Sequence, residues 1–157
     1  MGWPELRACA NDPFRLDYTG MNDNDVLWSI VHAGNRIQER LEDSLEETGL
    51  SLAKLKALKH LVEAREPMAL GQLAEKIACV KSNVTQLVDR LENDGLVQRV
   101  PDPSDRRSVL AAVTEEGRRR YQAGSAALAE AEREMLTAIP DGARGSVNSV
   151  LSGFTKV

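Results

Sequence analysis

Two groups of polar side chains in the middle of the sequence carry the chemistry needed to contact a polyanion. The first lies in residues 81–94, where a helical spacing places polar side chains on one face. The residues of that face are Ser82, Gln86, Asp89, Arg90 and Asn93, with Asn83 on its flank. The second is the pair Arg106 and Arg107, which follows a turn-rich stretch. Amides and hydroxyls hydrogen-bond to base edges, and guanidinium groups bind phosphates or enter the minor groove. This chemistry predicts a nucleic-acid site.

The distribution of charge favours the same place, although the whole chain is acidic. The 157 residues carry a net charge of −4. Residues 1–49 hold 4 basic and 10 acidic side chains, residues 50–120 hold 13 and 10, and residues 121–157 hold 3 and 4. The middle block is therefore the one with a positive balance, +3, and we expect an anionic partner there.

Several other classes of protein are excluded by what the sequence lacks. It contains no glycine-rich phosphate loop, nucleophile elbow or paired acid motif, so we expect no enzyme activity and no cofactor. His32 and His60 are isolated, and no cluster has metal-ligand spacing. Cys9 and Cys79 do not make a disulfide framework. No apolar run reaches the roughly 20 residues of a membrane helix, and the N-terminus lacks the apolar stretch of a signal peptide. These features predict a soluble, cytoplasmic protein.

Helices and a hairpin surround the two polar groups in a definite order. Residues 1–22 predict an irregular N-terminal arm, because prolines and Gly20 are scattered through it. The elements predicted after it are helices over 24–48, from Ser51 to about Pro67, over 71–77 and over 81–94, strands over 96–100 and 109–113, a long helix capped by Thr114 that ends before Pro140, and a short helix around 144–153. This order indicates a mainly α fold with a small β-hairpin wing, a winged helix-turn-helix.

The first predicted helix is apolar on two sides. One face carries the residues Val26, Ile30, Ala33, Ile37, Leu41 and Leu45 at spacings of three and four. Trp28, Val31 and His32 make the other side largely apolar as well. A helix of this kind is usually buried between two bodies, so we expect it to lie in a dimer interface.

The motifs of the central segment resemble those of the MarR family of transcriptional regulators. The first matches are Leu73-Ala74-Glu75, the run Val84-Thr85-Gln86-Leu87-Val88-Asp89-Arg90-Leu91-Glu92, and Gly95-Leu96-Val97. The wing sequence Asp102-Pro103-Ser104-Asp105-Arg106-Arg107-Ser108, followed by Val113-Thr114-Glu115-Glu116-Gly117, is similar to the family's Asp-x-Arg-Ser…Leu-Thr-x-x-Gly signature. The resemblance covers about residues 24–139 in matching order and spacing.

The resemblance implies a homodimeric DNA-binding regulator, in most members a repressor. It assigns residues 51–114 to the winged helix-turn-helix and residues 23–50 and 115–157 to a helical dimerisation region. Two-fold symmetry would place two recognition helices about 34 Å apart on a pseudopalindromic operator. The residues that fall where the family contacts bases and phosphates are Ser82, Asn83, Thr85 and Gln86, and we assign Arg90 to phosphate. The resemblance further places Arg107, beside Arg106, in the minor groove, with Asp105 as its orienting partner.

Two positions depart from the family pattern, and both bear on which operator sequence is bound. Val80 stands where Ser or Thr commonly caps the recognition helix. Gln86 stands where arginine is frequent, and glutamine favours adenine over guanine.

The mode of regulation stays open at this stage. Many family members release DNA when a small aromatic ligand binds or when a cysteine oxidises. Trp28 and His32, one turn apart, either border an effector pocket or pack in the dimer core. Cys9 and Cys79 are the residues that a redox-sensing repressor would use. A winged-helix module that binds protein and not DNA is a further alternative, but an acidic recognition helix or a missing wing arginine would be typical of it.

Overall fold

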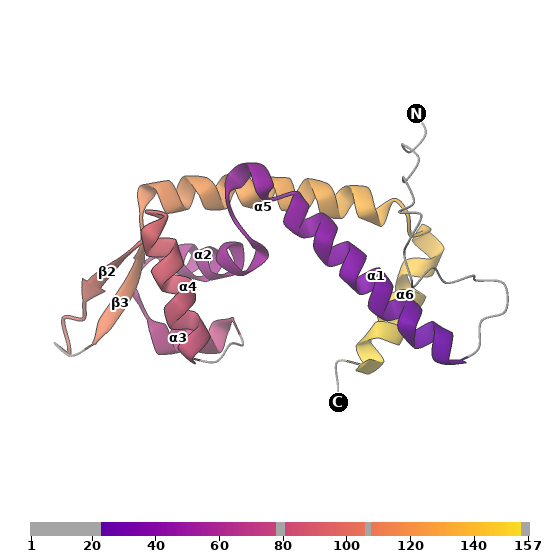
Figure 1. Cartoon of the computed structure of the whole chain (residues 1–157), viewed down its shortest axis with the longest axis horizontal. Helices are drawn as coiled ribbons and strands as arrows, with labels where there is room; N and C mark the ends of the chain where they lie inside the picture. Colours follow the sequence, from indigo (N-terminus) through magenta and orange to yellow (C-terminus); the bar gives the residue numbers. More distant parts are fainter. Residues whose placement is uncertain (1–22, 78–80, 106–107, 155–157) are drawn as a thin grey trace, which may run out of the picture. The chain divides into compact units, whose positions relative to one another are not determined.

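The computed structural model describes residues 23–77, 81–105 and 108–154, which form helices and one small antiparallel sheet (Figure 1). These residues divide into two compact units, the first ending at Gln38 and the second beginning at Glu39. The elements in chain order are α1 (Asp23–Asp43), the 3-10 helix η1 (Glu46–Thr48), α2 (Leu52–Ala64), β1 (Met68–Ala69), α3 (Leu70–Lys76), α4 (Lys81–Asn93), β2 (Val97–Pro101), β3 (Val109–Val113), α5 (Glu115–Leu136) and α6 (Asp141–Phe154). The predicted fold class, mainly α with a hairpin wing, is confirmed.

Helix ends coincide with the capping residues that the sequence offers. Ser51 Oγ accepts a hydrogen bond from the backbone N–H of Lys54 at 3.3 Å, and Thr114 Oγ1 accepts one from Gly117 at 3.0 Å. Gly49 and Gly95 take positive φ values of 67° and 72°, in which a glycine has no side-chain penalty. These caps set the start of α2 and α5 and the turns that follow η1 and α4.

The first helix ends earlier than predicted. The sequence predicts one helix over 24–48, whereas α1 stops at Asp43 and the chain continues as η1. The backbone pattern changes there, because the N–H groups of Leu45 and Thr48 donate to carbonyls three residues back, those of Glu42 and Leu45, at 3.0 and 2.9 Å. Bonds of this spacing form a 3-10 turn in place of the α-helical ladder.

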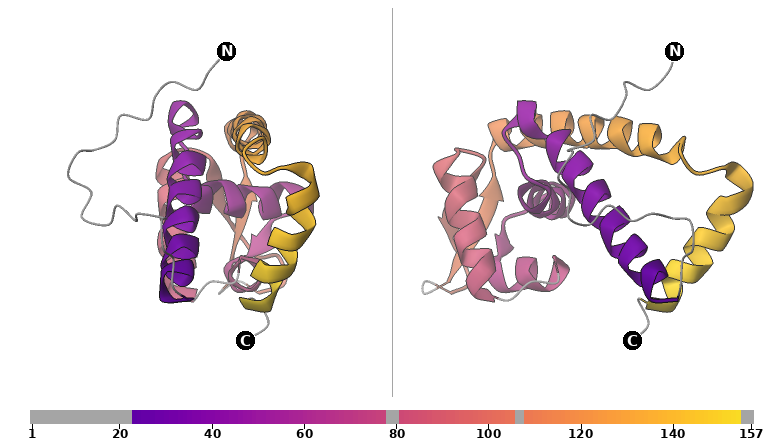
Figure 2. Two further views of the ribbon diagram at one scale, coloured as in Figure 1. Left: turned by 90° about the vertical axis from the view of Figure 1, so that its right-hand side faces the viewer. Right: turned by 45° about the vertical axis from the view of Figure 1, so that its right-hand side comes forward.

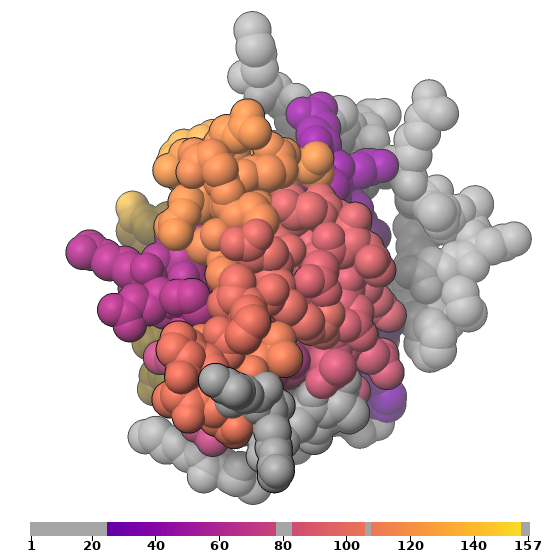
Figure 3. All heavy atoms as spheres, turned by 90° about the vertical axis from the view of Figure 1, so that its left-hand side faces the viewer, coloured from indigo at the N-terminus to yellow at the C-terminus, as the bar shows by residue number. Residues whose placement is uncertain are grey.

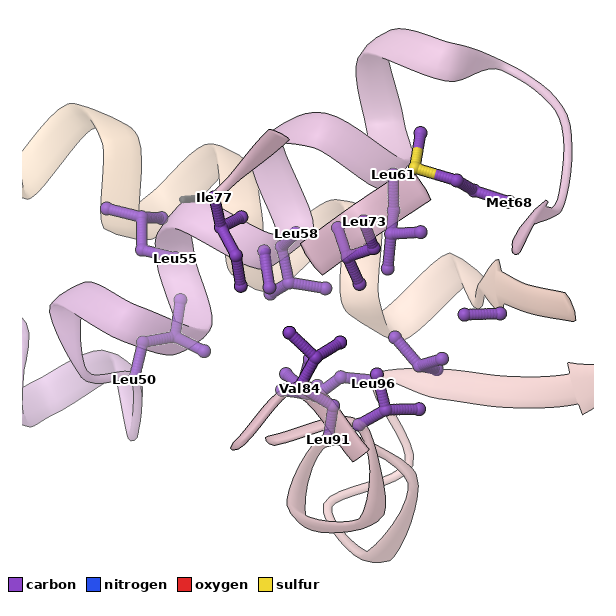
Figure 4. Close-up of a cluster of buried hydrophobic side chains, with 14 of the residues drawn as sticks. Leu50, Leu55, Leu58, Leu61, Met68, Leu73, Ile77, Val84, Leu91 and Leu96 are labelled. Atoms are coloured by element: carbon purple, nitrogen blue, oxygen red, sulfur yellow. The ribbon is translucent and has the colours of Figure 1, made fainter. Parts of the chain in front are cut away.

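The core of the second unit is built almost entirely from aliphatic side chains (Figure 4). Its fully buried large members are Leu45, Leu58, Leu61, Leu73, Leu91, Leu96, Val84, Val88 and Val97. They come from the residue before η1, from α2, α3 and α4, from the turn after α4 and from β2, so the helices around α4 share one core. Of the apolar face predicted for the first helix, only Leu45 joins this core; Val26 and Ile37 are 41% and 48% exposed, and the dimer interface expected to cover them stays a prediction.

The sheet has the strand order β1-β3-β2, and both pairings are antiparallel. Val97 pairs with Val113 and Pro101 with Val109, which gives the hairpin predicted over 96–113. β1 was not predicted; Met68 pairs with Ala111, so the hairpin also joins the segment between α2 and α3. The second view of Figure 2 shows α4 beside this hairpin. The sheet therefore connects the hairpin with the segment between α2 and α3.

The start of α5 packs closely on the turn that follows α4. The backbone N–H of Thr114 donates to the Leu96 carbonyl at 3.0 Å, and its Oγ1 donates to the Gly95 carbonyl at 2.7 Å. A Cβ on Gly117 would meet the Leu96 carbonyl oxygen at 2.0 Å, so this position has room for glycine alone.

None of the helices in the described residues combines the length and the apolar composition that a membrane-spanning helix needs.

Candidate nucleic-acid interface

The residues of α4 divide cleanly between core and surface. Val84, Val88 and Leu91 are fully buried and fix the rotation of the helix about its axis. The exposed residues of the opposite side are Asn83, Thr85, Gln86, Asp89, Arg90 and Asn93. The side chain of Ser82, also predicted for this site, lies outside the described residues. Figure 3 shows the α4 surface (rose) directly beside the surface of the hairpin (red-orange). The structure thus presents donors, acceptors and a cation together on one helix face.

Arg99 of β2 joins the hairpin to α4. Its guanidinium forms ion pairs with Asp89 and Glu92, and its backbone N–H donates to Glu92 Oε1 at 3.1 Å. The hydrogen bond to the Asp89 carboxylate is the main cause that raises the pKa of Arg99 above its ordinary value. Sequence analysis missed this cluster; the signal available was an arginine in the strand after a helix with two carboxylates three residues apart.

The tip of the wing is held by short hydrogen bonds between its own residues. Asp102 Oδ1 accepts hydrogen bonds from the backbone N–H of Ser104 at 2.8 Å and from its hydroxyl at 2.6 Å. Ser108 Oγ donates to Asp105 Oδ2 at 3.2 Å, and the Ser108 N–H donates to the Asp105 carbonyl at 2.9 Å. The bonds from Ser104 lower the pKa of Asp102 below its ordinary value. Arg106 and Arg107 lie outside the described residues, so their predicted roles stay predictions.

A third ion pair lies just beyond the C-terminal end of α4. Lys54 Nζ of α2 lies 2.7 Å from Asp94 Oδ2, directly after the last turn of α4. Lys56 Nζ donates to the Ile77 carbonyl at 3.1 Å and so holds the end of α3 against α2. α4 is thereby fixed by its buried face, by Arg99 and by α2, which makes it a rigid platform for its exposed side chains.

The residues predicted for an effector pocket lie on α1. Trp28 is 54% exposed and His32 is half-buried. Both belong to the first compact unit, and their role as a ligand site stays a prediction. Among the described residues, no three His, Cys, Asp or Glu side chains come together in a way that could hold a metal ion.

Comparison with known proteins decides the family. The model of the MarR family matches residues 50–109, which span α2, α3, α4 and the hairpin up to the start of β3. The HTH-type transcriptional regulator YsmB of Bacillus subtilis is 30% identical over 117 residues, which are 74% of this chain and 80% of YsmB. The chain belongs to the MarR family.

Solved structures of MarR-type regulators share the fold of this MarR-family chain. CouR from Rhodococcus jostii RHA1, bound to p-coumaroyl-CoA, is 30% identical and superposes with a TM-score of 0.66, covering 83% of this chain and 92% of CouR. A structure of the transcriptional repressor CouR bound to a 23-mer DNA duplex has a TM-score of 0.71 at 23% identity, covering 82% and 90%. Membership of the MarR family makes the chain a transcriptional regulator and not an enzyme.

Proposed function

We propose that this MarR-family regulator is a homodimeric repressor that binds double-stranded DNA in a sequence-specific way. The observation that carries the proposal is the division of α4, whose three core positions are fully buried while Asn83, Gln86 and Arg90 are exposed on the opposite side. An α-helix fits the major groove of B-DNA, and amide side chains read base edges there. We assign base contacts to Ser82, Asn83, Thr85 and Gln86, and a phosphate contact to Arg90.

The wing supplies the second contact of the proposal. Arg107, assisted by Arg106, enters the minor groove, which attracts guanidinium groups where it is narrow. Asp105 orients Arg107. The hydrogen bonds of Asp102 and Asp105 with Ser104 and Ser108 support this role, because they fix the residues on either side of the two arginines.

The dimer of the proposal is formed by the first and last parts of the chain, residues 23–50 and 115–157. Exposed large apolar side chains gather on two helices: Val26, Leu27, Trp28, Val31 and Ile37 on α1, and Val147, Val150, Leu151 and Phe154 on α6. Monomeric soluble proteins rarely expose so much apolar surface, so nine such side chains on two helices indicate an interaction surface. A second copy of the chain is the occupant that the family resemblance implies.

Release from DNA by a small aromatic or phenolic effector completes the proposal. CouR, which is 30% identical to this chain, holds p-coumaroyl-CoA, and the phenolic acyl group of that thioester supports a ligand with a phenolic ring. We place Trp28 and His32 at the border of the effector pocket, where an indole ring and an imidazole provide stacking and a hydrogen bond.

Selection of bound sequences from a random DNA pool tests the proposed function. We expect a pseudopalindrome whose half-sites are one helical turn apart, and a dimer in sedimentation both free and bound. Aromatic acids are then titrated into the complex with the selected operator. Failure to enrich any sequence would contradict the proposal, and so would binding of the operator by a monomer.

A further inference from the structure

The arginine of β2 occupies a central place between the two proposed DNA-contacting elements. Arg99 reaches from the strand to two carboxylates of α4, Asp89 and Glu92, with one guanidinium nitrogen for each. Its backbone N–H also donates to Glu92, so Glu92 bonds both the side chain and the main chain of the same residue. The Arg99 side chain is 27% exposed, and its two terminal guanidinium nitrogens each bond a carboxylate of α4.

The first consequence concerns Asp89. Asp89 lies on the exposed side of α4 and is separated by three residues from Gln86 and by four from Thr85. A free carboxylate at this place would repel phosphates, and it would accept a hydrogen bond from the amine of cytosine. Because Asp89 pairs with Arg99, part of its charge is compensated and its Oδ1 is occupied. The Asp89 side chain remains 50% exposed, and Arg99 weakens the repulsion that this carboxylate exerts on phosphates.

The second consequence concerns the hairpin. Arg99 pairs with Ala111 of β3, so the ion pairs with α4 act at the middle of the hairpin and not at its tip. The loop that carries Arg107 continues directly from these two strands. A planar guanidinium that bonds two carboxylates one helical turn apart resists rotation of the strand relative to the helix. Besides the shared core, these ion pairs fix the hairpin strands against α4.

We propose that Arg99 is a positioning residue for DNA binding: through Asp89 and Glu92 it holds the hairpin against the recognition helix, and it offsets one of the two negative charges that these carboxylates carry. The proposal rests on the proposed DNA-binding function. Arg99 itself contacts no base in this arrangement. Its loss affects the wing contact and the electrostatic repulsion, and it leaves the base preference set by Gln86 intact.

The variant Arg99→Met tests the proposal with the selected operator, and Arg119→Met serves as the matched control. Arg119 also pairs with one carboxylate, Glu116 at 2.7 Å, but it lies on α5 and not between α4 and the hairpin. We expect Arg99→Met to bind the operator at least about fivefold more weakly than the unsubstituted protein. The slope of the logarithm of the binding constant against the logarithm of the salt concentration should fall in magnitude by about one per half-site, and hydroxyl-radical protection of the minor groove should be lost. Selection of bound sequences from a random DNA pool with the same variant should give the same preferred bases as the unsubstituted protein. Arg119→Met should keep the operator affinity and the hydroxyl-radical protection pattern of the unsubstituted protein.

A second substitution separates the two roles of Arg99. In Arg99→Met/Asp89→Asn the repulsive carboxylate is gone, so affinity should recover in part while the minor-groove protection stays lost. No recovery overturns the neutralising role, and full return of the protection overturns the positioning role. If Arg99→Met does not fold, Arg99→Lys replaces it; a lysine ammonium lacks the two-pronged geometry, so weakened protection is expected and an unchanged footprint overturns the proposal. Failure of the unsubstituted protein to bind any DNA contradicts the proposed function itself, whereas equal footprints of Arg99→Met and Arg119→Met contradict only the role of Arg99.

Discussion

The Leu96 carbonyl oxygen stands 2.0 Å from the place where a Cβ on Gly117 would lie. This contact joins the turn after α4 to the first turn of α5, and a methyl group of Val113 lies 2.9 Å from the same point. The glycine of the Thr-Glu-Glu-Gly motif is therefore required by the approach of a backbone oxygen. Glycine at this position allows the first turn of α5 to pack directly against the turn that follows α4.

Substitution of Gly117 by alanine should destabilise the fold. Backbone cannot give way as a flexible side chain does, so we expect a loss of about 2–3 kcal/mol in the free energy of unfolding. Urea denaturation followed by circular dichroism measures it. Gly71→Ala is the control: Gly71 lies in α3 with nothing within 4 Å of its Cβ position, and its change should stay within about 1 kcal/mol. Equal effects of the two variants would contradict this account of Gly117.

Acidic substitutions on α6 should convert the proposed dimer into monomers. Val150 and Phe154 are 58% and 56% exposed and lie one helical turn apart. The double variant Val150→Glu/Phe154→Glu places two carboxylates in an apolar interface, where an unpaired charge is costly. Sedimentation at micromolar concentration should then show a monomer with unchanged helix content. Val109→Glu, at a wing position 45% exposed, is the control and should stay dimeric. A dimeric double variant would place the interface elsewhere.

Removal of the Gln86 amide should change which bases are bound more than how tightly DNA is bound in general. The amide of glutamine pairs with N7 and the N6 amine of adenine. Gln86→Ala should flatten the preference at one position of each half-site, at a cost of about 1–3 kcal/mol. Arg90→Ala should weaken all sequences alike, because a phosphate contact carries no sequence information. Site selection on both variants distinguishes these outcomes. Unchanged preferences for Gln86→Ala would mean that Asn83 or Arg90 reads the bases.

The wing arginine should contribute to affinity and to its salt dependence. Arg107→Ala is expected to weaken operator binding by about 1–3 kcal/mol and to lower the salt slope by about one unit. Arg106→Ala, which removes the same charge one residue earlier, should have a smaller effect. Titrations at several salt concentrations measure both quantities. Unchanged affinity and slope in a folded dimeric Arg107→Ala protein would exclude the wing from the groove.

The wing turn should lose stability only in acid. Folding lowers the pKa of Asp102, so its ionised form stabilises the turn at every pH above the ordinary value of 3.8. This contribution is lost as the pH falls through the lowered value. A carboxyl chemical-shift titration should therefore give a midpoint for Asp102 below 3.8, and Asp102→Asn identifies the resonance by its disappearance. A midpoint at or above the ordinary value would mean that the bonds from Ser104 do not form in solution.

The parts of the fold that follow from local sequence were predicted well. The apolar positions of α4, the stop at Gly95 and the caps at Ser51 and Thr114 depend on residues close together in the chain. β1 was missed because two residues are too few to show an alternation, and it forms through its pairing with β3. Helical spacing shows that the face with Val26 and Ile37 is apolar but not what covers it, so the dimer interface expected there stays a prediction.

The candidate site shows the same limit. Sequence analysis placed Gln86, Arg90 and Asn93 on one exposed face correctly, with Asn83 on its flank, because their spacing matches the helical period. It also counted Asp89 among the solvent-facing polar residues without detecting Arg99, which lies ten positions later on a strand. Contacts between a helix and a neighbouring strand depend on the register of the strand, and one sequence does not fix that register.

The order of the three strands has a consequence for how the protein behaves at high concentration. β3 is central, so the two outer strands are β1 and β2, and their free backbone groups are where a foreign strand would add. β1 has two residues and directly follows Pro67, and β2 ends at Pro101, which has no N–H to offer. Both borders of the sheet are therefore poor templates for intermolecular strand addition, and the wing can project from the domain without seeding aggregates.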